Sequence, residues 1–542
     1  MKKPWSDINA IYQIYPRSFM DANGDGIGDL RGVIDRLDYF KGKKDSLGID
    51  AIWFSPIYPS PMVDFGYDVS DYRDIDPTFG TLDDFKELIA KAHEHGVAVM
   101  LDFVPNHSSD QHPWFLEAKS SRDNPKRDYY TWADPKPDGS PPNNWISIFG
   151  GSAWELDKAS GQYYMHTFFK EQPDLNWDNP AVRVEMAEIL RFWLDLGVDG
   201  FRADAVRYMA KDAKLRDDPK NKKWKGKPGA YESLIQLHSR FGKQLFPYLR
   251  EMTDVISEYD DRIMIFEDYP DGNFDTKEQY LGFYSIDPKV SMPFNFEGMW
   301  TQFDAESFRR FITDFQGMLN QDEHTPVYCF GNHDNPRLVS RIGSEQARAI
   351  AVMQLALPGI PVVYYGDELG MPNGELEDHH IKDQSSAENA MGGRDLSRTP
   401  MQWDATDHGG FTCSEPWLPA VADPAKLNVE KELGDHDSFL ALYRRMLKLR
   451  SKYEIFTSGD YETFGEADPN VYVFSRRLNK QHVFIVINFS DKPQGYQLPH
   501  YGRVLCCSHP VDYPDISKSG EVSLRAFEAV VIECSEHPLV KD

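Results

Sequence analysis

Four segments of this chain carry carboxylate side chains, and three of them also carry histidine or arginine. They read DFVPNH at 102–107, GFRAD at 200–204, ED at 267–268 and GNHD at 331–334. Carboxylates, histidine and arginine are the groups that enzymes use to move protons and to stabilise developing charge. One such carboxylate is usually a solvated loop residue, but four of these segments in one chain seldom arise by chance. We therefore predict that they meet in one catalytic site.

The elements that must position these segments are short runs rich in β-branched and aromatic residues. Such runs alternate with longer helical patterns, which indicates a parallel sheet, either an open doubly wound sheet or a barrel. Neither a GxGxxG nor a P-loop motif supports a nucleotide-binding open sheet. We therefore predict an α/β fold, a (β/α)8 TIM barrel, whose reactive side chains gather at the carboxyl ends of the strands. Strands are expected at 11–16, 51–56, 97–105, 197–202, 262–267, 326–331 and 360–366, with a weaker candidate near 281–294.

Two regions depart from this alternation. Residues 106–176 are rich in proline, asparagine, aspartate and aromatics, and we interpret them as a small subdomain inserted after the third strand. In residues 459–542, alternating apolar and polar positions predict a C-terminal antiparallel β-sandwich. The catalytic barrel is then expected to comprise residues 1–105 and 177–458.

Together the four segments resemble a known family. DFVPNH, GFRADAV, IMIFED and FGNHD are similar, in this order, to the four signature segments of the α-amylase family of glycoside hydrolases, glycoside hydrolase family 13. Further motifs spread over nearly the whole chain resemble the α-glucosidase and oligo-1,6-glucosidase branch rather than endo-acting amylases. These motifs are IYQIYPRSF, DFGYDVSDY, QPDLNWDNP and GRDLSRTPMQWD.

The resemblance implies a role for each carboxylate of the site. Asp204 would attack the anomeric carbon and form a covalent glucosyl-enzyme, while Arg202 holds that carboxylate ionised. Glu267 would protonate the departing oxygen and then deprotonate the incoming water. Asp334 would bind sugar hydroxyls and stabilise the transition state rather than transfer a proton.

The same resemblance supplies the expected sugar-binding residues. Tyr67 is similar to a stacking platform for the terminal glucose, and Asp64 to the residue that closes the pocket over its non-reducing end. One arginine of GRDLSR pairs with such an aspartate, and both Arg394 and Arg398 remain candidates for that pairing. For Phe149 and Phe168, two of the remaining contacts, a place in the core of the inserted subdomain is a nearly equal alternative to a place in the pocket wall. Those remaining contacts are His107, His333, Phe149 and Phe168.

Oxygen-bearing residues also alternate around a glycine turn near the N-terminus. Hard oxygen donors at this spacing are typical of a Ca²⁺ site, with Mg²⁺ as the alternative ion. An EF-hand loop ends in glutamate at its twelfth position, where Gly32 stands here. In the resembling branch this loop binds a structural cation, whereas an Asx-turn loop without an ion is the competing interpretation. The expected ligands are Asp21, Asn23, Asp25, the Ile27 carbonyl and Asp29.

Composition limits the partners of the protein. The chain has 542 residues and a formal net charge of -27. Such an acidic surface repels phosphate backbones and anionic lipids, so we expect no nucleic acid and no membrane partner, and a small neutral oligosaccharide as substrate. Five cysteines without CxxC spacing, and no apolar signal segment, predict a cytoplasmic protein. Monomer and homodimer both remain open.

The function that the resemblance implies is a retaining, exo-acting α-glucosidase that releases α-glucose from the non-reducing end of short α-glucosides, with transglucosylation as an accompanying reaction. Ala205 favours α-1,4 bonds, as in maltose, because valine at this position accompanies α-1,6 preference in the resembling branch. The alternatives are an α-glucosyl transferase or isomerase acting on sucrose or trehalose, an oligo-1,6-glucosidase, and a phosphotrehalose hydrolase. An inactive binding scaffold is disfavoured, since all three carboxylates are present and no membrane anchor is found.

Overall fold

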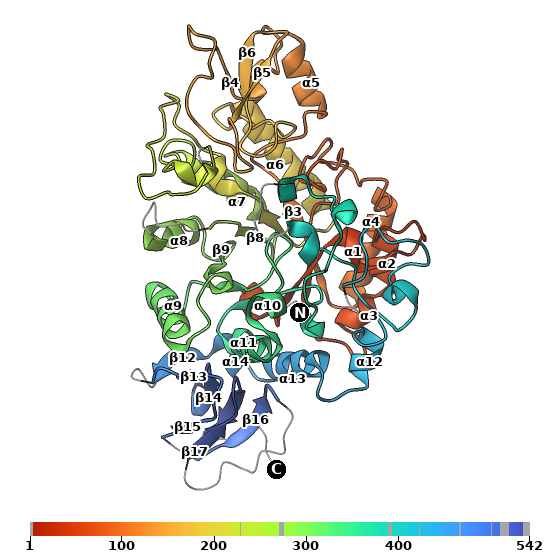
Figure 1. Ribbon diagram of the computed structural model, residues 1–542, viewed down its shortest axis with the longest axis vertical. Coiled ribbons are helices and arrows are strands. Elements are labelled where there is room, and N and C mark those ends of the chain that lie inside the picture. Colours follow the sequence, from red (N-terminus) through yellow and green to blue (C-terminus); the bar gives the residue numbers. More distant parts are fainter. Residues whose placement is uncertain are drawn as a thin grey trace.

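The computed structural model describes residues 4–227, 229–269, 276–387, 393–421, 423–464, 468–499, 501–509 and 520–534. At its centre eight parallel strands close into a barrel in the order β1-β11-β10-β9-β8-β7-β3-β2, which confirms the predicted barrel (Figure 1). The strands are β1 (Ile11–Ile14), β2 (Ala51–Phe54), β3 (Ala98–Phe103), β7 (Gly200–Ala203), β8 (Ile263–Phe266), β9 (Ser291–Asn295), β10 (Val327–Cys329) and β11 (Ile360–Tyr364).

The weakest of the predicted strands lies later than the sequence indicated. Strand β9 begins at Ser291, and helix α8 (Thr276–Tyr284) occupies the first part of the segment 281–294. Tyr280, Phe283 and Tyr284 are buried on one side of α8. Apolar residues at three- and four-residue spacing form one face of a helix, and this periodicity decides the conformation here.

Alternate residues of each barrel strand pack on its two faces. Side chains such as Trp53, Met100 and Ile265 fill the inside of the barrel, while Ile52 and Leu101 pack outward against the helices. Both faces are therefore buried, which explains why the strands read as nearly continuous apolar runs.

Helices surround the barrel, and several begin with side-chain caps. Helix α4 starts with a reciprocal capping box between Thr81 and Asp84, and α6 starts with Asn179 as cap and Pro180 in the first turn. Such caps satisfy amide groups that a helix end leaves unpaired. The helices of the barrel and its connections are α1 (Pro16–Phe19), α2 (Leu30–Asp35), α3 (Leu37–Phe40), α4 (Leu82–Glu94), α6 (Pro180–Asp195), α7 (Leu245–Ile256), α8, α9 (Ala305–Met318), α10 (Leu338–Ile342), α11 (Ser344–Ala356), α12 (Val429–Leu433), α13 (Phe439–Lys452) and α14 (Ile455–Ser458).

A small antiparallel sheet follows strand β3 and lies at one end of the long axis of the molecule (Figure 1). It has the order β4-β6-β5, from Trp132–Ala133, Gln162–Met165 and Trp154–Asp157, and helix α5 (Pro113–Ser120) precedes it. Isolated bridges His107↔Asp174 and Tyr130↔Leu175 join the start and the end of this excursion. The insertion therefore stays close to the carboxyl end of β3.

Antiparallel sheets at the opposite end of the molecule complete the fold, as predicted (Figure 1). Helices α11 and α13 pack against the larger of the two sheets. Within the described ranges, no helix combines the length and apolar character needed to cross a bilayer. The sheets have the orders β12-β13-β14-β18-β16 and β15-β17, from β12 (Asp460–Phe464), β13 (Val471–Leu478), β14 (Gln481–Asn488), β15 (Gln494–Gln497), β16 (Arg503–Cys507), β17 (Glu521–Leu524) and β18 (Ala529–Glu533).

Candidate active site

The three carboxylates singled out in the sequence line one pocket at the carboxyl ends of the barrel strands. Asp204 and Glu267 directly follow the neighbouring strands β7 and β8, and Asp334 lies in the loop after β10. The pocket has a volume of about 330 Å³. Predicted sugar-binding residues also line it, namely Asp64, Tyr67, His107, Phe149, Phe168 and Arg394.

Arg202 joins the carboxylates from behind the pocket. Its Nη1 donates to Asp204 Oδ1 at 2.6 Å and to Asp102 Oδ1 at 2.7 Å, and its Nη2 lies 2.5 Å from Glu267 Oε1. Only 1% of Arg202 is exposed, so these ion pairs are weakly screened by water. Burial raises the pKa of Asp204, and the charge of Arg202 opposes that rise. Asp102, the carboxylate of DFVPNH, thus lies in the site, although sequence reasoning assigned it no role of its own.

The residue after Asp204 fixes the second oxygen of Glu267. Ala205 adopts the left-handed conformation, with φ 49° and ψ 32°, and its N–H donates to Glu267 Oε2 at 2.8 Å. For an L-residue this backbone conformation costs about 1–2 kcal/mol. Arg202 and Ala205 together hold both oxygens of Glu267, which leaves this carboxyl one orientation toward the pocket.

Arg398 and His333 hold Asp334. Arg398 Nη2 donates to Asp334 Oδ1 at 3.0 Å, and His333 Nε2 lies 3.3 Å from Asp334 Oδ2. Desolvation acts to raise the pKa of Asp334, but His333, Arg394 and Arg398 outweigh it and hold that pKa well below its usual range. Asp334 is therefore ionised at neutral pH.

The pairing partner of Asp64 is Arg394, which decides between the two arginines that the sequence left open. Arg394 Nη2 donates to Asp64 Oδ1 at 2.6 Å. The same guanidinium also binds Asp383. Its Nε donates to Asp383 Oδ2 and its Nη2 donates to Asp383 Oδ1, both at 2.8 Å. Sequence reasoning missed Asp383, since no motif includes it.

Two buried histidines are held neutral near the pocket. Burial lowers the pKa of His333 to about 3 and that of His107 to about 4. The ring of Tyr67 is parallel to that of His333, at 2° with centroids 5.4 Å apart, and the Tyr67 hydroxyl lies 2.8 Å from His333 Nε2. Gln172 Nε2 lies 3.1 Å from both His107 Nε2 and Asp64 Oδ2. Gln172 thereby links the His107 and Asp64 sides of the pocket, a connection that the sequence did not indicate.

Aromatic side chains form two walls of the pocket. On the side of the inserted subdomain, Phe149 stacks on Phe169 with centroids 4.2 Å apart, and Phe168 lies edge-on to Tyr208 at 5.6 Å. The predicted phenylalanines thus face the pocket as well as the subdomain. The other wall was not predicted, because its residues belong to no signature segment. It consists of Tyr269 and Trp300.

In the N-terminal loop predicted to bind a cation, carboxylate oxygens accept hydrogen bonds from nearby backbone N–H groups. Asp21 accepts from the N–H groups of Gly24 at 2.6 Å and Gly26 at 2.8 Å, and Asp29 caps helix α2 through Gly32 N–H at 2.7 Å. Gly26 has φ 89°, and a Cβ there would lie 2.1 Å from the carbonyl oxygen of Glu415, so glycine is required. Both aspartates are buried, and among the described residues no ion pair to either is found. The donor set is all oxygen, which suits a hard divalent cation, but the carboxylates of Asp21, Asp25 and Asp29 do not converge on one point in this structure.

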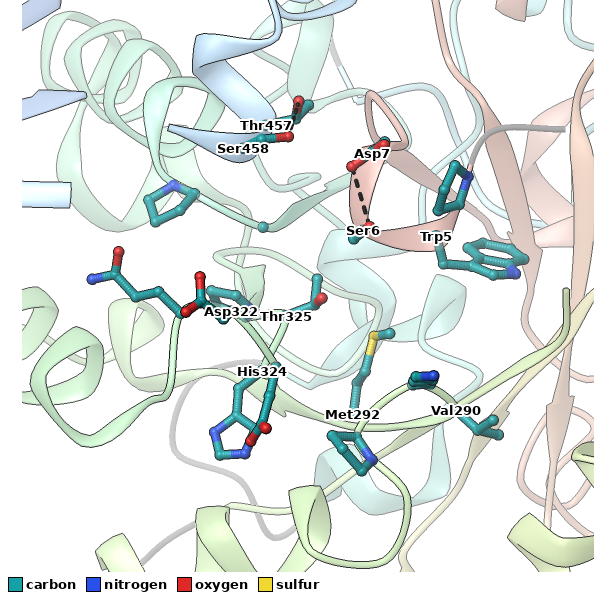
Figure 2. Close-up of a pocket in the computed structure, with 18 of the residues that line it drawn as sticks. Trp5, Ser6, Asp7, Val290, Met292, Asp322, His324, Thr325, Thr457 and Ser458 are labelled. Carbon is teal, nitrogen blue, oxygen red and sulfur yellow. Dashed lines mark hydrogen bonds between the residues drawn. The ribbon is translucent and has the colours of Figure 1, made fainter. Parts of the chain in front are cut away.

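A larger pocket, of about 740 Å³, lies at the opposite end of the barrel. Val290, Pro326 and Gly359, each directly before a barrel strand, are part of its lining. Figure 2 shows Asp322 and His324 among the side chains that surround it. None of the predicted catalytic and sugar-binding residues lines this larger pocket; all of them line the pocket of about 330 Å³, called the smaller pocket below, or contact its walls.

Comparison with known proteins places this geometry in context. The family model described as alpha amylase, catalytic domain, matches residues 13–459. An oligo-1,6-glucosidase of Parageobacillus thermoglucosidasius is 38% identical, with 98% of this chain and 99% of that protein covered. A probable alpha-glucosidase of Rhizobium meliloti (strain 1021) is 39% identical over 92% of this chain and 91% of its own. The crystal structure of an alpha-glucosyl transfer enzyme, XgtA, aligns with a TM-score of 0.89 at 36% identity, covering 98% of this chain and 100% of that one.

Proposed function

The chain belongs to the α-amylase family and is a glycoside hydrolase, and from this premise we propose that it is a retaining, exo-acting α-glucosidase. The substrates proposed are short neutral α-glucosides, cleaved at the non-reducing end. One observation carries the proposal: Arg202 binds the carboxylates of both Asp204 and Glu267 at the base of a pocket that the Asp64–Arg394 pair closes.

In the proposed mechanism Asp204 and Glu267 act in two steps. Asp204 attacks C1 of the glucosyl unit while Glu267 gives its proton to the departing oxygen, which leaves a covalent glucosyl ester on Asp204. Glu267 then takes a proton from water as the water oxygen bonds to C1 and the ester bond breaks. One guanidinium contacting both carboxylates favours the separation of about 5–5.5 Å that this route needs over the roughly 6.5–9.5 Å of inversion. The ionised Asp334 supplies negative charge beside the oxocarbenium-like transition state.

The closed end of the pocket supports exo action on short substrates. Asp64 and Arg394 meet at 2.6 Å, and the Arg394 guanidinium lies 5.5 Å from the centroid of the Phe149 ring. A chain of sugars cannot continue past this ion pair without breaking it. The pocket therefore suits a terminal glucosyl unit rather than the middle of a polysaccharide.

The stereochemical outcome tests the proposal. Purified protein is mixed with maltose, and the first glucose released is followed by proton NMR before mutarotation scrambles it. We expect α-glucose to appear first. An initial β-glucose signal would contradict the two-step mechanism, and no cleavage of maltose, isomaltose, sucrose or trehalose would overturn the function as a whole.

The linkage preference proposed is α-1,4 over α-1,6, and it depends on Ala205. This residue lines the pocket directly after Asp204, and its small side chain leaves the leaving-group side open. Ala205→Val should shift the ratio of kcat/KM values toward isomaltose by about 1–3 kcal/mol, the scale of a methyl-sized change in a pocket. Ala205→Gly, which also suits a positive φ, should keep the maltose preference. A wild-type enzyme that strongly prefers isomaltose would favour the oligo-1,6-glucosidase alternative, the name that several relatives bear.

Transfer of the glucosyl unit to another sugar is the second candidate reaction. The similarity to an alpha-glucosyl transfer enzyme over nearly the full chain favours it. Chromatography of the products from concentrated maltose or sucrose separates the candidates. Glucose alone indicates hydrolysis, trisaccharides indicate transfer, and a new disaccharide from sucrose indicates an isomerase.

We also propose that the loop at residues 21–29 binds one structural Ca²⁺ or Mg²⁺ through Asp21, Asn23, Asp25, the Ile27 carbonyl and Asp29. Its support is the all-oxygen donor set and the burial of Asp21 and Asp29. A cation bound only by the folded chain raises stability, so a chelator should lower the melting temperature by about 5 °C. The variant Asp25→Ala should not respond to the chelator. An unchanged melting temperature of wild type, with no metal detected by elemental analysis, would contradict the proposal.

A further inference from the structure

Trp300 is a large, exposed side chain at the mouth of the catalytic pocket. Its exposed fraction is 58%, and it lines the pocket together with Glu267 and Asp334. Single exposed apolar residues are common on protein surfaces, so exposure alone assigns nothing. The position of this ring beside the carboxylates is what requires an explanation.

The indole ring is supported by a fixed aromatic stack. Trp300 lies edge-on to Tyr269 with centroids 5.5 Å apart, and Tyr269 stacks on Phe296 at 4.4 Å. Asn332 Nδ2 donates to the Tyr269 hydroxyl at 3.2 Å. The short helix η5 (Glu297–Met299) ends directly before Trp300. These contacts support the ring from one side, while more than half of the residue stays exposed.

The location of Trp300 identifies which half of a substrate it meets. The glucosyl end of the pocket is closed by Asp64, Arg394 and Phe149. Trp300 contacts Tyr269, two residues after Glu267, the carboxyl that must reach the glycosidic oxygen. Trp300 also lines a second hollow of about 650 Å³, whose walls include Phe303 and Phe489 and which leads toward the C-terminal sheets. The ring therefore lies on the open, leaving-group side of the bond.

We propose that Trp300 is a specificity-determining residue that stacks against the ring of the leaving group, whether a second sugar or an aryl group. Sugars present apolar C–H faces, and aromatic rings contact both these faces and other rings favourably. The inference rests on the proposed function, because it needs Glu267 as the acid/base that marks the leaving-group side. It adds an aromatic recognition residue to the half of the pocket where the sequence had indicated Ala205 alone.

The same ring serves the acceptor in a transfer reaction, since an acceptor enters where the leaving group departs. The acceptor hydroxyl oxygen bonds to C1, and its proton passes to the Glu267 carboxylate. The bond from C1 to Asp204 breaks, and its electron pair returns to the Asp204 carboxylate. Stacking on Trp300 favours a sugar over water in this step.

Trp300→Ala tests the proposal with three substrates that share the glucosyl unit. Maltose and 4-nitrophenyl α-glucoside have a ring as leaving group, whereas α-glucosyl fluoride has none. We expect kcat/KM to fall about five- to tenfold more for the two ring-bearing substrates than for the fluoride, the scale of one aromatic contact. Trp300→Phe should recover most of this difference. Tyr501→Ala, at a residue 73% exposed on the C-terminal region, should change none of the three.

Two results would overturn the inference. Equal losses on all three substrates would mean that Trp300 supports the pocket walls, and equal activity of Trp300→Ala and wild type would mean that the ring makes no contact. Wild type that cleaves none of the three would instead refute the proposed glucosidase function. The failure of the function and the failure of the inference are thus distinguishable.

Discussion

The two ends of the barrel each carry a pocket, and the larger one is not the catalytic candidate. At the carboxyl ends of the strands, about 330 Å³ is bordered by Asp204, Glu267 and Asp334. At the other end, about 740 Å³ is bordered by side chains such as Asp322 and His324 (Figure 2). Volume alone would select the second pocket.

The difference lies in how the charges are held. In the smaller pocket Arg202 and Arg398 are almost fully buried, 12% of the Arg394 side chain is exposed, and each of the three contacts carboxylates at fixed distances. In the larger pocket Asp322 is exposed and His324 only partly buried. Charges in water are screened, whereas buried pairs interact strongly and keep their geometry. Chemistry therefore depends on buried, oriented charges, and TIM barrels place them at the carboxyl ends of the strands.

The strongest test of this comparison removes the nucleophile. Asp204→Asn should lower kcat for maltose by at least about 10⁴-fold, because no covalent intermediate can form. Circular dichroism should show an unchanged fold. Retention of more than a few per cent of the activity would contradict the role of Asp204.

A smaller loss is expected when the support of the closed end is weakened. Asp383→Asn removes the charge that binds Arg394, and removing one partner of a hydrogen-bonded charge pair of this kind typically costs about 2–5 kcal/mol. We expect kcat/KM for maltose to fall by about 30- to 100-fold, mostly through KM, since Asp383 is a positioning residue that acts through Arg394. Asp378→Asn, an exposed residue of the same connection, is the matched control. Equal values for both variants would show that Arg394 needs no such support.

The pH dependence of stability should also differ between the two ends. Burial lowers the pKa of His107 to about 4, whereas an unfolded chain gives histidine about 6.5. The unfolded state then binds the proton first, so stability is complete above about pH 6.5 and falls as the pH drops toward 4. At about pH 5 the loss from this group amounts to about 2 kcal/mol.

Urea unfolding of variants at pH 7 and pH 5 measures this effect. His107→Gln should lose less stability than wild type between the two pH values. His324→Gln, in the larger pocket, should change this loss less than His107→Gln does, because His324 is only partly buried and burial lowers its pKa less. Variants must be compared because burial raises the pKa of Asp102 to about 7, which acts with the opposite sign. Equal pH responses of His107→Gln and wild type would contradict a buried, neutral His107.

The smallest effect is expected in the larger pocket itself. Asp322→Asn changes one exposed charge on its wall, and surface substitutions usually alter stability by less than about 0.5 kcal/mol. Activity on maltose should stay within about twofold of wild type. A loss of activity comparable to that of Asp383→Asn would contradict the comparison, because it would show that the larger pocket also affects catalysis.

Much of the fold and the centre of the site could be predicted because their signals are local. Barrel strands are short apolar runs, and the residues that follow them, such as Asp204 and Glu267, must lie at one end of the barrel. The exception was the segment 281–294, where aromatic residues at helical spacing resembled a strand. Asp383 and Trp300 were missed because each lies in a connection whose path no local pattern determines.

The sequence by itself determined the barrel and the family, since the alternation of apolar runs with helical patterns and the signature segments depend only on neighbouring residues. Only the tertiary structure decided which arginine meets which carboxylate. Arg394 and Arg398 are four residues apart, yet Arg394 binds Asp64, 330 residues away, while Arg398 binds Asp334. The physical reason is that an ion pair forms over about 3 Å. The path of the connecting loop, rather than residue type, sets which side chain comes that close.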